Sequence, residues 1–460
     1  MVVVYNTPYH CILPDTDNPH QPMSNIKVLT LGWEFPPLVN GGLGIACLGL
    51  SKALAKKVDL RVIVPKADPS VHTDGFQLTG LNNVSFREVE QVDRKYSYES
   101  FAMVEHAPIE LDPYTTVEGE TGMIQFTQEG RISFSRTHEA DLQLFKNKED
   151  LYAGDLALKV IQFSKIAAKI AMQQDFDVIH AHDWLTYYAG IAAKRVSGKP
   201  LVVHMHATEF DRSGENINTQ VYAIERAGMH AADRVIAVSN LTRNIVINRY
   251  GVPADRVVTV HNAVRFAEGS SEVPERGVKD KIVTFLGRIT YQKGPDYFVE
   301  AAAKVLKRVP DVRFVMAGSG DMMNHVIRRV ARLGIADRFH FTGFLRGEDV
   351  HKMFQLSDVY VMPSVSEPFG ISPLEAMRSN VPVIISKQSG VAEVLDYAVK
   401  VDYWDVDALA DAIYALVKYP ALAGMFASKG LEEVTNLKWN DAAAKIKSVY
   451  EAVIEESKNK

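Results

Sequence analysis

Short runs of consecutive apolar, often β-branched residues recur along the first half of the chain and alternate with segments whose apolar residues have helical spacing. Such continuous runs are typical of strands buried on both faces, as in parallel sheets. The predicted strands are Ile26–Leu31, Leu60–Val64, Asp177–Ala181, Leu201–His206 and Arg234–Val238, and the predicted helices are Leu43–Lys57, Ala157–Met172, Tyr187–Arg195 and Val221–His230. The alternation predicts a doubly wound α/β sheet.

The same pattern resumes in the second half of the chain. Its predicted strands are Lys281–Leu286, Arg313–Ala317, Phe339–Thr342, Val359–Met362 and Val383–Ile385, and its predicted helices are Pro295–Arg308, Met322–Leu333, Gly347–Leu356 and Ile371–Ser379. The second half is therefore expected to form a sheet of its own.

Two stretches interrupt the pattern. Residues 66–155 are rich in charged and aromatic residues, with a candidate hairpin at Met123–Phe134, and we interpret them as an insertion on the first domain. Residues 265–280 are rich in Glu, Ser and Gly and form the best candidate linker. A chain of 460 residues also exceeds one ordinary core, so two domains are expected.

The predicted fold class is accordingly α/β, with two Rossmann-like doubly wound domains. We assign residues 1–262 to an N-terminal domain and residues 263–437 to a C-terminal one. The last helix, about 438–460, carries an apolar stripe that includes Trp439 and Tyr450, and we expect it to cross back and pack on the first domain. Residues 1–24 do not resemble a signal peptide, and a lid or an edge strand both remain open for them.

Composition excludes several classes of function. The chain is 47% hydrophobic and 23% charged with a formal net charge of −5, which gives no sign of nucleic acid or an anionic membrane as the main partner. It contains no run of about 18 apolar residues, so we expect no transmembrane helix. Only Cys11 and Cys47 are present, which favours a reducing cytoplasm over a disulfide framework. Homo-oligomerisation is left open.

A glycine-rich turn separates the first predicted strand from the first helix. Glycines here let backbone N–H groups approach a phosphate at a helix N-terminus. The dinucleotide fingerprint is absent because Gly42 and Gly44 are followed by Cys47, and the Walker lysine is absent because Leu50 takes its place. A phosphate-binding loop at Gly41 and Gly42 remains, with a purely structural turn as the alternative. Gly318 lies in a second glycine turn, which alone is weak evidence.

Two cations flank the turn after the first strand of the second half. Arg288 offers a bidentate guanidinium and Lys293 a point charge, as a departing diphosphate requires. Two solvated surface cations are the alternative. The position favours a site, because open α/β sheets bind ligands at the carboxyl ends of their strands.

The strongest signal is the run from Ser366 to Met377. Pro368 and Gly370 indicate a tight turn before a helix whose free N–H groups face outward. Glu367 precedes that helix and Glu375 lies one turn into it. These carboxylates suit sugar or ribose hydroxyls, although charge complementarity at the helix N-terminus is the alternative for Glu375.

These motifs together resemble the retaining glycosyltransferases of the GT-B fold. The Glu-x7-Glu run, the Gly-Arg-x4-Lys-Gly turn, the Gly-Gly loop and the segment from His180 to Trp184 occur in the order of that group, from about residue 26 to 458. Gly32-Trp33-Glu34-Phe35-Pro36-Pro37 and His-Ala-His-Asp-Trp look most like bacterial glycogen or starch synthases. The resemblance implies two facing domains with a cleft between them.

The resemblance also implies roles for individual residues. Arg288 and Lys293 would hold the donor diphosphate, Glu367 the donor sugar hydroxyls and Glu375 the ribose. The remaining members are the active-site residues His206 and Asp183 and the donor-binding residues Gly41, Gly42, Gly318, Leu345, Phe369, Gly370, Ile371 and Ser372.

One departure concerns the donor side. Glycogen synthases usually carry Lys-x-Gly-Gly, whereas Leu38, Val39 and Asn40 precede the Gly-Gly pair here. The Glu-x7-Glu run also fits the broader group better than the strict glycogen synthase pattern. Both points leave the donor, UDP-glucose or ADP-glucose, and the acceptor open.

Four histidines, His180, His182, His204 and His206, lie in two predicted strands. We expect one member of each pair to reach the cleft and the other to pack. Zinc would need three or four converging ligands, and no cysteine supports them, so no metal is expected. Asp15-Thr16-Asp17 and Asp405-Val406-Asp407 resemble a metal motif, but we interpret them as solvated caps.

The expected function is retaining transfer of glucose from a nucleotide diphosphate glucose to an α-glucan, without a cofactor. A lipid, polyol or sugar acceptor is the main alternative. A sugar-nucleotide epimerase, a pyridoxal-dependent glucan phosphorylase and a non-catalytic glucan-binding protein are the other hypotheses. The last of these is disfavoured because every charged site residue is present.

Overall fold

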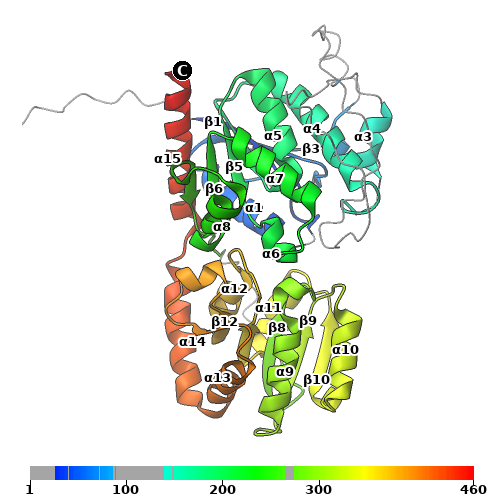
Figure 1. The fold of residues 1–460 in the computed structure, drawn as a ribbon, viewed down its shortest axis with the longest axis vertical. Coiled ribbons are helices and arrows are strands. Elements are labelled where there is room, and N and C mark those ends of the chain that lie inside the picture. Colours follow the sequence, from blue (N-terminus) through cyan, green and yellow to red (C-terminus); the bar gives the residue numbers. More distant parts are fainter. Residues whose placement is uncertain are drawn as a thin grey trace, which may run out of the picture.

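The computed structural model describes residues 26–39, 41–71, 73–85, 89, 139–147, 150–264 and 274–459. They form two α/β domains, one above the other in Figure 1, each built on one parallel sheet. The predicted fold class is confirmed. Among the described residues no single helix is both long and apolar enough to cross a membrane, and only a bent pair, Val406–Lys418 with Pro420–Lys458, reaches the length and composition, with a 98° break.

The N-terminal sheet has seven parallel strands in the order β3-β2-β1-β4-β5-β6-β7. The strands are β1 (Lys27–Leu31), β2 (Asp59–Val64), β3 (Phe76–Gly80), β4 (Val178–His182), β5 (Leu201–Met205), β6 (Arg234–Ala237) and β7 (Val257–Thr259). The helices are α1 (Gly42–Leu54), α3 (Glu139–Lys146), α4 (Leu156–Met172), α5 (Trp184–Ser197), α6 (Glu209–Ser213), α7 (Thr219–Ala231) and α8 (Asn240–Tyr250).

Alternate residues of β1 enter different cores because successive side chains of a strand point to opposite faces. Leu29 and Leu31 pack with α3, α4, α5 and α7 on one face of the sheet. Val28 packs with α1 on the other face. Both faces are covered, which explains why the strands are continuous apolar runs.

The C-terminal sheet has six parallel strands in the order β10-β9-β8-β11-β12-β13. The strands are β8 (Lys281–Leu286), β9 (Val312–Ala317), β10 (Phe339–Gly343), β11 (Val359–Met362), β12 (Val383–Ser386) and β13 (Val399–Val401). The helices are α9 (Pro295–Leu306), α10 (Met323–Arg332), α11 (Glu348–Leu356), α12 (Ser372–Arg378), α13 (Val406–Lys418) and α14 (Pro420–Thr435). Val359 and Val361 enter one core, whereas Tyr360 and Met362 enter the other.

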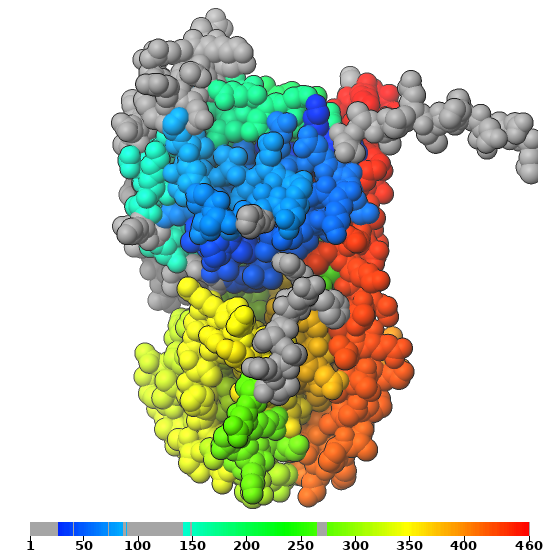
Figure 2. Space-filling view, turned by 180° about the vertical axis from the view of Figure 1, so that it is seen from behind, coloured from blue at the N-terminus to red at the C-terminus, as the bar shows by residue number. Residues whose placement is uncertain are grey.

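The C-terminal helix α15 (Trp439–Lys458) packs on the N-terminal domain. Its buried stripe, which includes Ala443, Ile446 and Tyr450, joins the core beneath α1 and β1. Contact with α1 is close, because a Cβ at Gly49 would lie 2.5 Å from Trp439 Nε1. Figure 2 shows this red segment along the edge of the N-terminal domain.

The sheets extend further than the sequence pattern predicts. β3 lies inside the predicted insertion, yet it pairs in parallel with β2. It was missed because Phe-Gln-Leu-Thr-Gly has no β-branched run and is only half buried at the sheet edge. β7 and β13 have three residues each, too few to give a pattern. The candidate hairpin Met123–Phe134 and residues 1–24 lie outside the described residues.

The carboxyl ends of the two sheets face each other. Ser366, after β11, donates a hydrogen bond of 2.6 Å to Asp211 Oδ1, after β5. Glu393, after β12, accepts the backbone N–H groups of Asn240 and Leu241 at 2.9 and 2.8 Å at the start of α8. All these residues lie in loops or helix starts that follow strands, so the domains meet through the edges at which α/β sheets bind ligands.

Candidate functional site

Each sheet has one point at which the strand order reverses, between β1 and β4 in the first domain and between β8 and β11 in the second. Ligands of open α/β sheets bind outside the carboxyl ends of the strands at such a point. Gly41 follows β1, Asp183 follows β4, Arg288 follows β8 and Glu367 follows β11. The sequence-predicted residues therefore come from the loops at the two reversal points, with His206 after the adjacent β5.

The structure brings Lys293 and Glu367 into one ion pair across the β8–β11 reversal point. Lys293 Nζ donates to Glu367 Oε2. Ser364 Oγ donates to the same oxygen at 3.3 Å. The two side chains are 20% and 9% exposed, so the pair is shielded from solvent on most sides and weakly screened by salt. Arg288 lies partly buried on the same turn.

These turns require glycine because neighbouring backbone atoms lie too close to leave room for a Cβ. Gly294 has φ +66, and a Cβ there would lie 2.1 Å from Pro363 O. Gly318 has φ +142, and its Cβ would lie 1.8 Å from Gly287 O. The loops after β8, β9 and β11 are thus locked together, which fixes Lys293. The donor-binding role of Gly318 stays a prediction, since its packing alone accounts for the glycine.

The run from Ser366 to Met377 forms a tight turn followed by α12. Gly370 has φ +98, in the left-handed region that favours glycine, and Ile371 stands just before Ser372, the first residue of α12. The side chain of Phe369 is buried in the core, so only its backbone faces the turn. Glu375 is partly buried, and burial raises its pKa against the opposing effect of Arg378.

The Gly41–Gly42 loop and the loop after β10 carry the remaining predicted donor-binding residues. Gly41 and Gly42 are exposed, and a Cβ at either would meet no atom within 4 Å, whereas a Cβ at Gly44 would lie 2.2 Å from Val39 Cγ1. The first two glycines therefore leave backbone open to a ligand, while Gly44 serves packing. Leu345 is partly buried after β10.

Our expectation that each histidine pair would split between cleft and core is wrong for His180 and His182, which are both buried, whereas in the second pair His204 is buried and His206 is partly exposed. Residues i and i+2 of a strand share a face, so His180 and His182 point the same way, as do His204 and His206. β4 and β5 pair with His182 opposite His204, and the four rings form one stack. His180 ends it with a 2.6 Å hydrogen bond to the Tyr450 hydroxyl of α15.

Burial keeps the stack uncharged. It lowers the pKa of His180 and of His206 to about 3. The pKa values of His182 and His204 are lowered well below the usual range, first by burial and then by the neighbouring histidines. His206 is the only partly exposed member of the stack.

Asp183 has a strained backbone at the end of β4. Its φ of 63 and ψ of 167 fall in a region that non-glycine residues rarely adopt and that costs about 1–3 kcal/mol. Burial raises the pKa of Asp183 to about 6, although Arg212 and nearby backbone N–H groups oppose it. Within the described chain its buried Oδ1 has no hydrogen-bond partner. A strained, incompletely bonded carboxylate is typical of a residue that completes its bonds with a ligand.

Two supporting residues were missed by the sequence analysis. Arg212 donates to Ala207 O at 3.0 Å and pairs with Glu209 and Glu225, which fixes the loop after His206.

Asp211 is the second of these residues. It closes a capping box with Thr208 and accepts a hydrogen bond from the Ser366 hydroxyl of the other domain. The Thr-x-x-Asp spacing could have indicated the cap, but nothing in the sequence indicates that Asp211 reaches the other domain.

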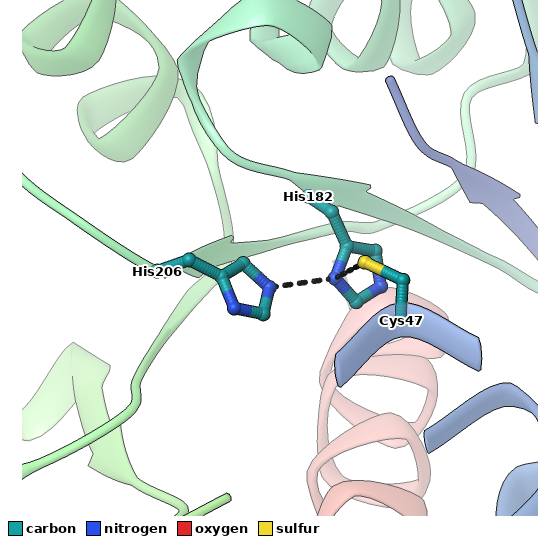
Figure 3. A group of neighbouring side chains, drawn as sticks. All are labelled: Cys47, His182 and His206. Atoms are coloured by element: carbon teal, nitrogen blue, oxygen red, sulfur yellow. Dashed lines mark hydrogen bonds between the residues drawn. The ribbon is translucent and has the colours of Figure 1, made fainter. Parts of the chain in front are cut away.

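The statement that no cysteine supports a histidine metal site is also wrong. Cys47, on the second turn of α1, places its Sγ 3.8 Å from His182 Nδ1, and the same nitrogen lies 2.9 Å from His206 Nε2 (Figure 3). Their ligand atoms all lie within 4.8 Å of one another, as do those of His180, His182 and His204. The sequence separation of Cys47 from both strands concealed this proximity.

Comparison with known proteins agrees with this geometry. Residues 147–268 match the Glycosyltransferase Family 4 and residues 268–432 match the Glycosyl transferases group 1. An uncharacterized glycosyltransferase of Methanocaldococcus jannaschii is 28% identical over 388 residues, which cover 81% of this chain and 84% of the relative. The glycogen synthase of Mycobacterium tuberculosis is 25% identical over 445 residues, covering 92% and 94%.

A solved structure shows the same fold at low identity. Sucrose-phosphate synthase from Thermosynechococcus elongatus superposes with a TM-score of 0.65 at 19% identity, covering 94% of this chain and all of that one (100%). Fold and family matches together identify the chain as a glycosyltransferase of the GT-B fold. Within that class it resembles the glycogen and starch synthases, as the sequence motifs predicted.

Proposed function

We propose that this protein transfers glucose, with retention of anomeric configuration, from UDP-glucose or ADP-glucose to the hydroxyl of an α-glucan. The observation that carries the proposal is the shielded Lys293–Glu367 pair at the β8–β11 reversal point, opposite Asp183 and His206. A cation for the leaving diphosphate and a carboxylate for the sugar hydroxyls are thereby held side by side.

The negatively charged diphosphate of the donor matches the positive charges of the second domain. Arg288 and Lys293 stabilise the diphosphate as its negative charge grows, a contribution that a water-poor site strengthens. Backbone N–H groups of Gly370, Ile371 and Ser372 add donors to the phosphates. Glu375 receives the ribose hydroxyls.

The first domain holds the sugar and the acceptor. His206, uncharged, contacts donor sugar hydroxyls, and Asp183 Oδ1 accepts one from the sugar or from the acceptor. Gly41 and Gly42 bring backbone N–H groups to the phosphate from the opposite side. The acceptor oxygen bonds to the anomeric carbon on the face that the diphosphate leaves, and the departing phosphate oxygen takes the acceptor's proton, so no enzyme-bound intermediate is needed.

The choice of acceptor is supported by the glycogen synthase likeness, which spans most of the chain. The likeness to sucrose-phosphate synthase favours the alternative of a sugar acceptor, and the missing Lys-x-Gly-Gly lysine leaves that alternative in place. Lipid and polyol acceptors remain further alternatives, because they would use the same donor and the same donor-binding residues.

A screen of donors and acceptors tests the proposal directly. Each nucleotide sugar is incubated with glycogen, simple sugars, polyols or lipid acceptors, and released nucleoside diphosphate is measured. We expect release that depends on glycogen, and NMR of the product should show the anomeric configuration of the donor. Inverted configuration would exclude retention, and release with another acceptor alone would exclude the α-glucan.

A further inference from the structure

We propose that Cys47, His182 and His206 form an inhibitory site for a zinc-like divalent cation. The site lies in the N-terminal domain and includes His206, which we place in the active site. The inhibitory effect rests on the proposed function, whereas the metal site itself does not. Figure 3 shows the Cys47 sulfur and a ring nitrogen of His206 both directed at one nitrogen of His182. The three side chains come from α1, β4 and the end of β5.

The distances approach those of a zinc site. Zinc–sulfur bonds of about 2.3 Å and zinc–nitrogen bonds of about 2.0–2.1 Å in tetrahedral geometry separate two nitrogens by about 3.3 Å and a nitrogen from a sulfur by about 3.6 Å. The observed separations are 2.9 Å between the His182 and His206 nitrogens and 3.8 Å between Cys47 Sγ and His182 Nδ1. These two separations differ from the tetrahedral values by a few tenths of an ångström, and the third, between Cys47 Sγ and His206, is within 4.8 Å.

The ligand set suits a borderline soft metal. One thiolate and two imidazoles select zinc-like ions over magnesium or calcium, which require oxygen ligands. On binding, the Cys47 thiol transfers its proton to solvent and its sulfur bonds to the metal, together with one nitrogen from each histidine. Three protein ligands leave a fourth position open for water.

The neighbouring triad of His180, His182 and His204 provides a contrast. All three of its members are buried, whereas His206 is partly exposed and gives an ion a path from the interdomain side. That triad also lacks a thiolate. Of the two groups, the accessible one with sulfur is therefore favoured.

Occupation of the site should block transfer through His206. Its Nε2 would be bonded to the metal and withdrawn from the donor sugar. The metal would also tie α1, which follows the Gly41–Gly42 loop, to β4 and β5, so that loop could no longer adjust to the phosphate. We therefore expect zinc at micromolar concentration to lower turnover.

Cobalt binding tests the site without any activity measurement. Co²⁺ titrated into the full chain should bind one ion per chain and give a thiolate-to-cobalt charge-transfer band. The band should be lost in Cys47→Ser and kept in Cys11→Ser, which removes the chain's other cysteine. His206→Gln should weaken cobalt binding at least tenfold, with circular dichroism confirming the fold of each variant. A band that persists in Cys47→Ser, or no cobalt binding at all, would overturn the site.

Zinc inhibition tests the consequence. The zinc concentration for half-inhibition should rise at least tenfold in Cys47→Ser and stay unchanged in Cys11→Ser, while both keep wild-type turnover in a chelator. Equal inhibition of wild type and Cys47→Ser would overturn the inhibitory role. If no donor and acceptor pair supports turnover, the proposed function fails, and the cobalt titration still decides whether the metal site exists.

Discussion

The two domains share a strand order around their reversal points but supply opposite chemistry there. The second domain provides charge: Lys293 and Glu367 are paired on loops whose glycines touch neighbouring backbone. The first domain provides uncharged rings and one strained carboxylate, with His206 at the end of a buried stack and Asp183 in a rare backbone conformation. Two sheets with the same strand order can therefore carry different functional groups at their carboxyl ends.

The difference shows how each half is kept in place. In the second domain, loops carry the chemistry, and backbone contacts make those loops rigid. In the first domain, the histidines belong to or directly follow the strands, so the sheet register itself aligns them. Substitutions should therefore act through loop packing in one half and through the stack in the other.

Removing the positive charge of Lys293 should have the largest effect, and that effect should be on turnover. We expect Lys293→Ala to lower kcat roughly 100- to 1000-fold with a smaller change in KM, because one preorganised group that stabilises developing charge is lost. Steady-state release of nucleoside diphosphate measures both constants. Lys304→Ala is the matched control, since Lys304 on α9 forms an exposed ion pair with Asp407 on α13, and its loss should leave kcat within about twofold. Near-normal turnover of Lys293→Ala would remove Lys293 from the reaction.

The rigidity of the loops can be tested with two glycines of nearly equal φ. Gly294 has φ +66 and its Cβ would meet Pro363 O at 2.1 Å, whereas Gly334 has φ +68 and open space around it. We expect Gly294→Ala to reduce the free energy of unfolding by about 3 kcal/mol and Gly334→Ala by about 1 kcal/mol, since only the first adds a clash to the strain. Urea unfolding measures both. Equal losses would show that the loops adjust freely.

The smallest effect concerns the contact between the domains. Burial raises the pKa of Glu393, but the hydrogen bond with His261 and the N–H groups of Asn240 and Leu241 outweigh it, so the pKa lies below its ordinary value. A carboxyl of this kind stabilises the fold above its ordinary pKa, and the benefit is lost as pH falls through the lowered one.

We therefore expect Glu393→Gln to cost about 1 kcal/mol at pH 7, with the gap to wild type closing below about pH 4. Urea unfolding at a series of pH values measures this difference. Glu432→Gln serves as the control, because Glu432 pairs with Lys429 on an exposed helix face and should change stability by only a few tenths of a kcal/mol. A gap that widens as pH falls would contradict the assignment.

The sequence predicted the fold well because buried parallel strands leave a strong local signal. The run Lys281–Leu286 has the same bounds as β8, and the predicted last helix is found as α15. Short or half-buried elements such as β13 and β3 leave too little signal, since their position depends on the strands beside them.

The site was less predictable because it depends on contacts distant in sequence. Arg288 and Lys293 could be found from their position after a strand, but the pairing of Lys293 with Glu367 joins residues on different loops. The position of Cys47 beside His182 depends on how α1 packs on the sheet. The shared face of His180 and His182, by contrast, follows from strand periodicity and was open to prediction.

The return of α15 has a consequence for synthesis on the ribosome. Domains generally fold as units, the N-terminal one first. Here the first domain buries Ala443, Ile446 and Tyr450, which are translated only after the whole second domain. Its core beneath α1 therefore stays exposed while the whole second domain is synthesised. A nascent chain that stops after residue 262 exposes the same apolar surface, which we expect chaperones to bind.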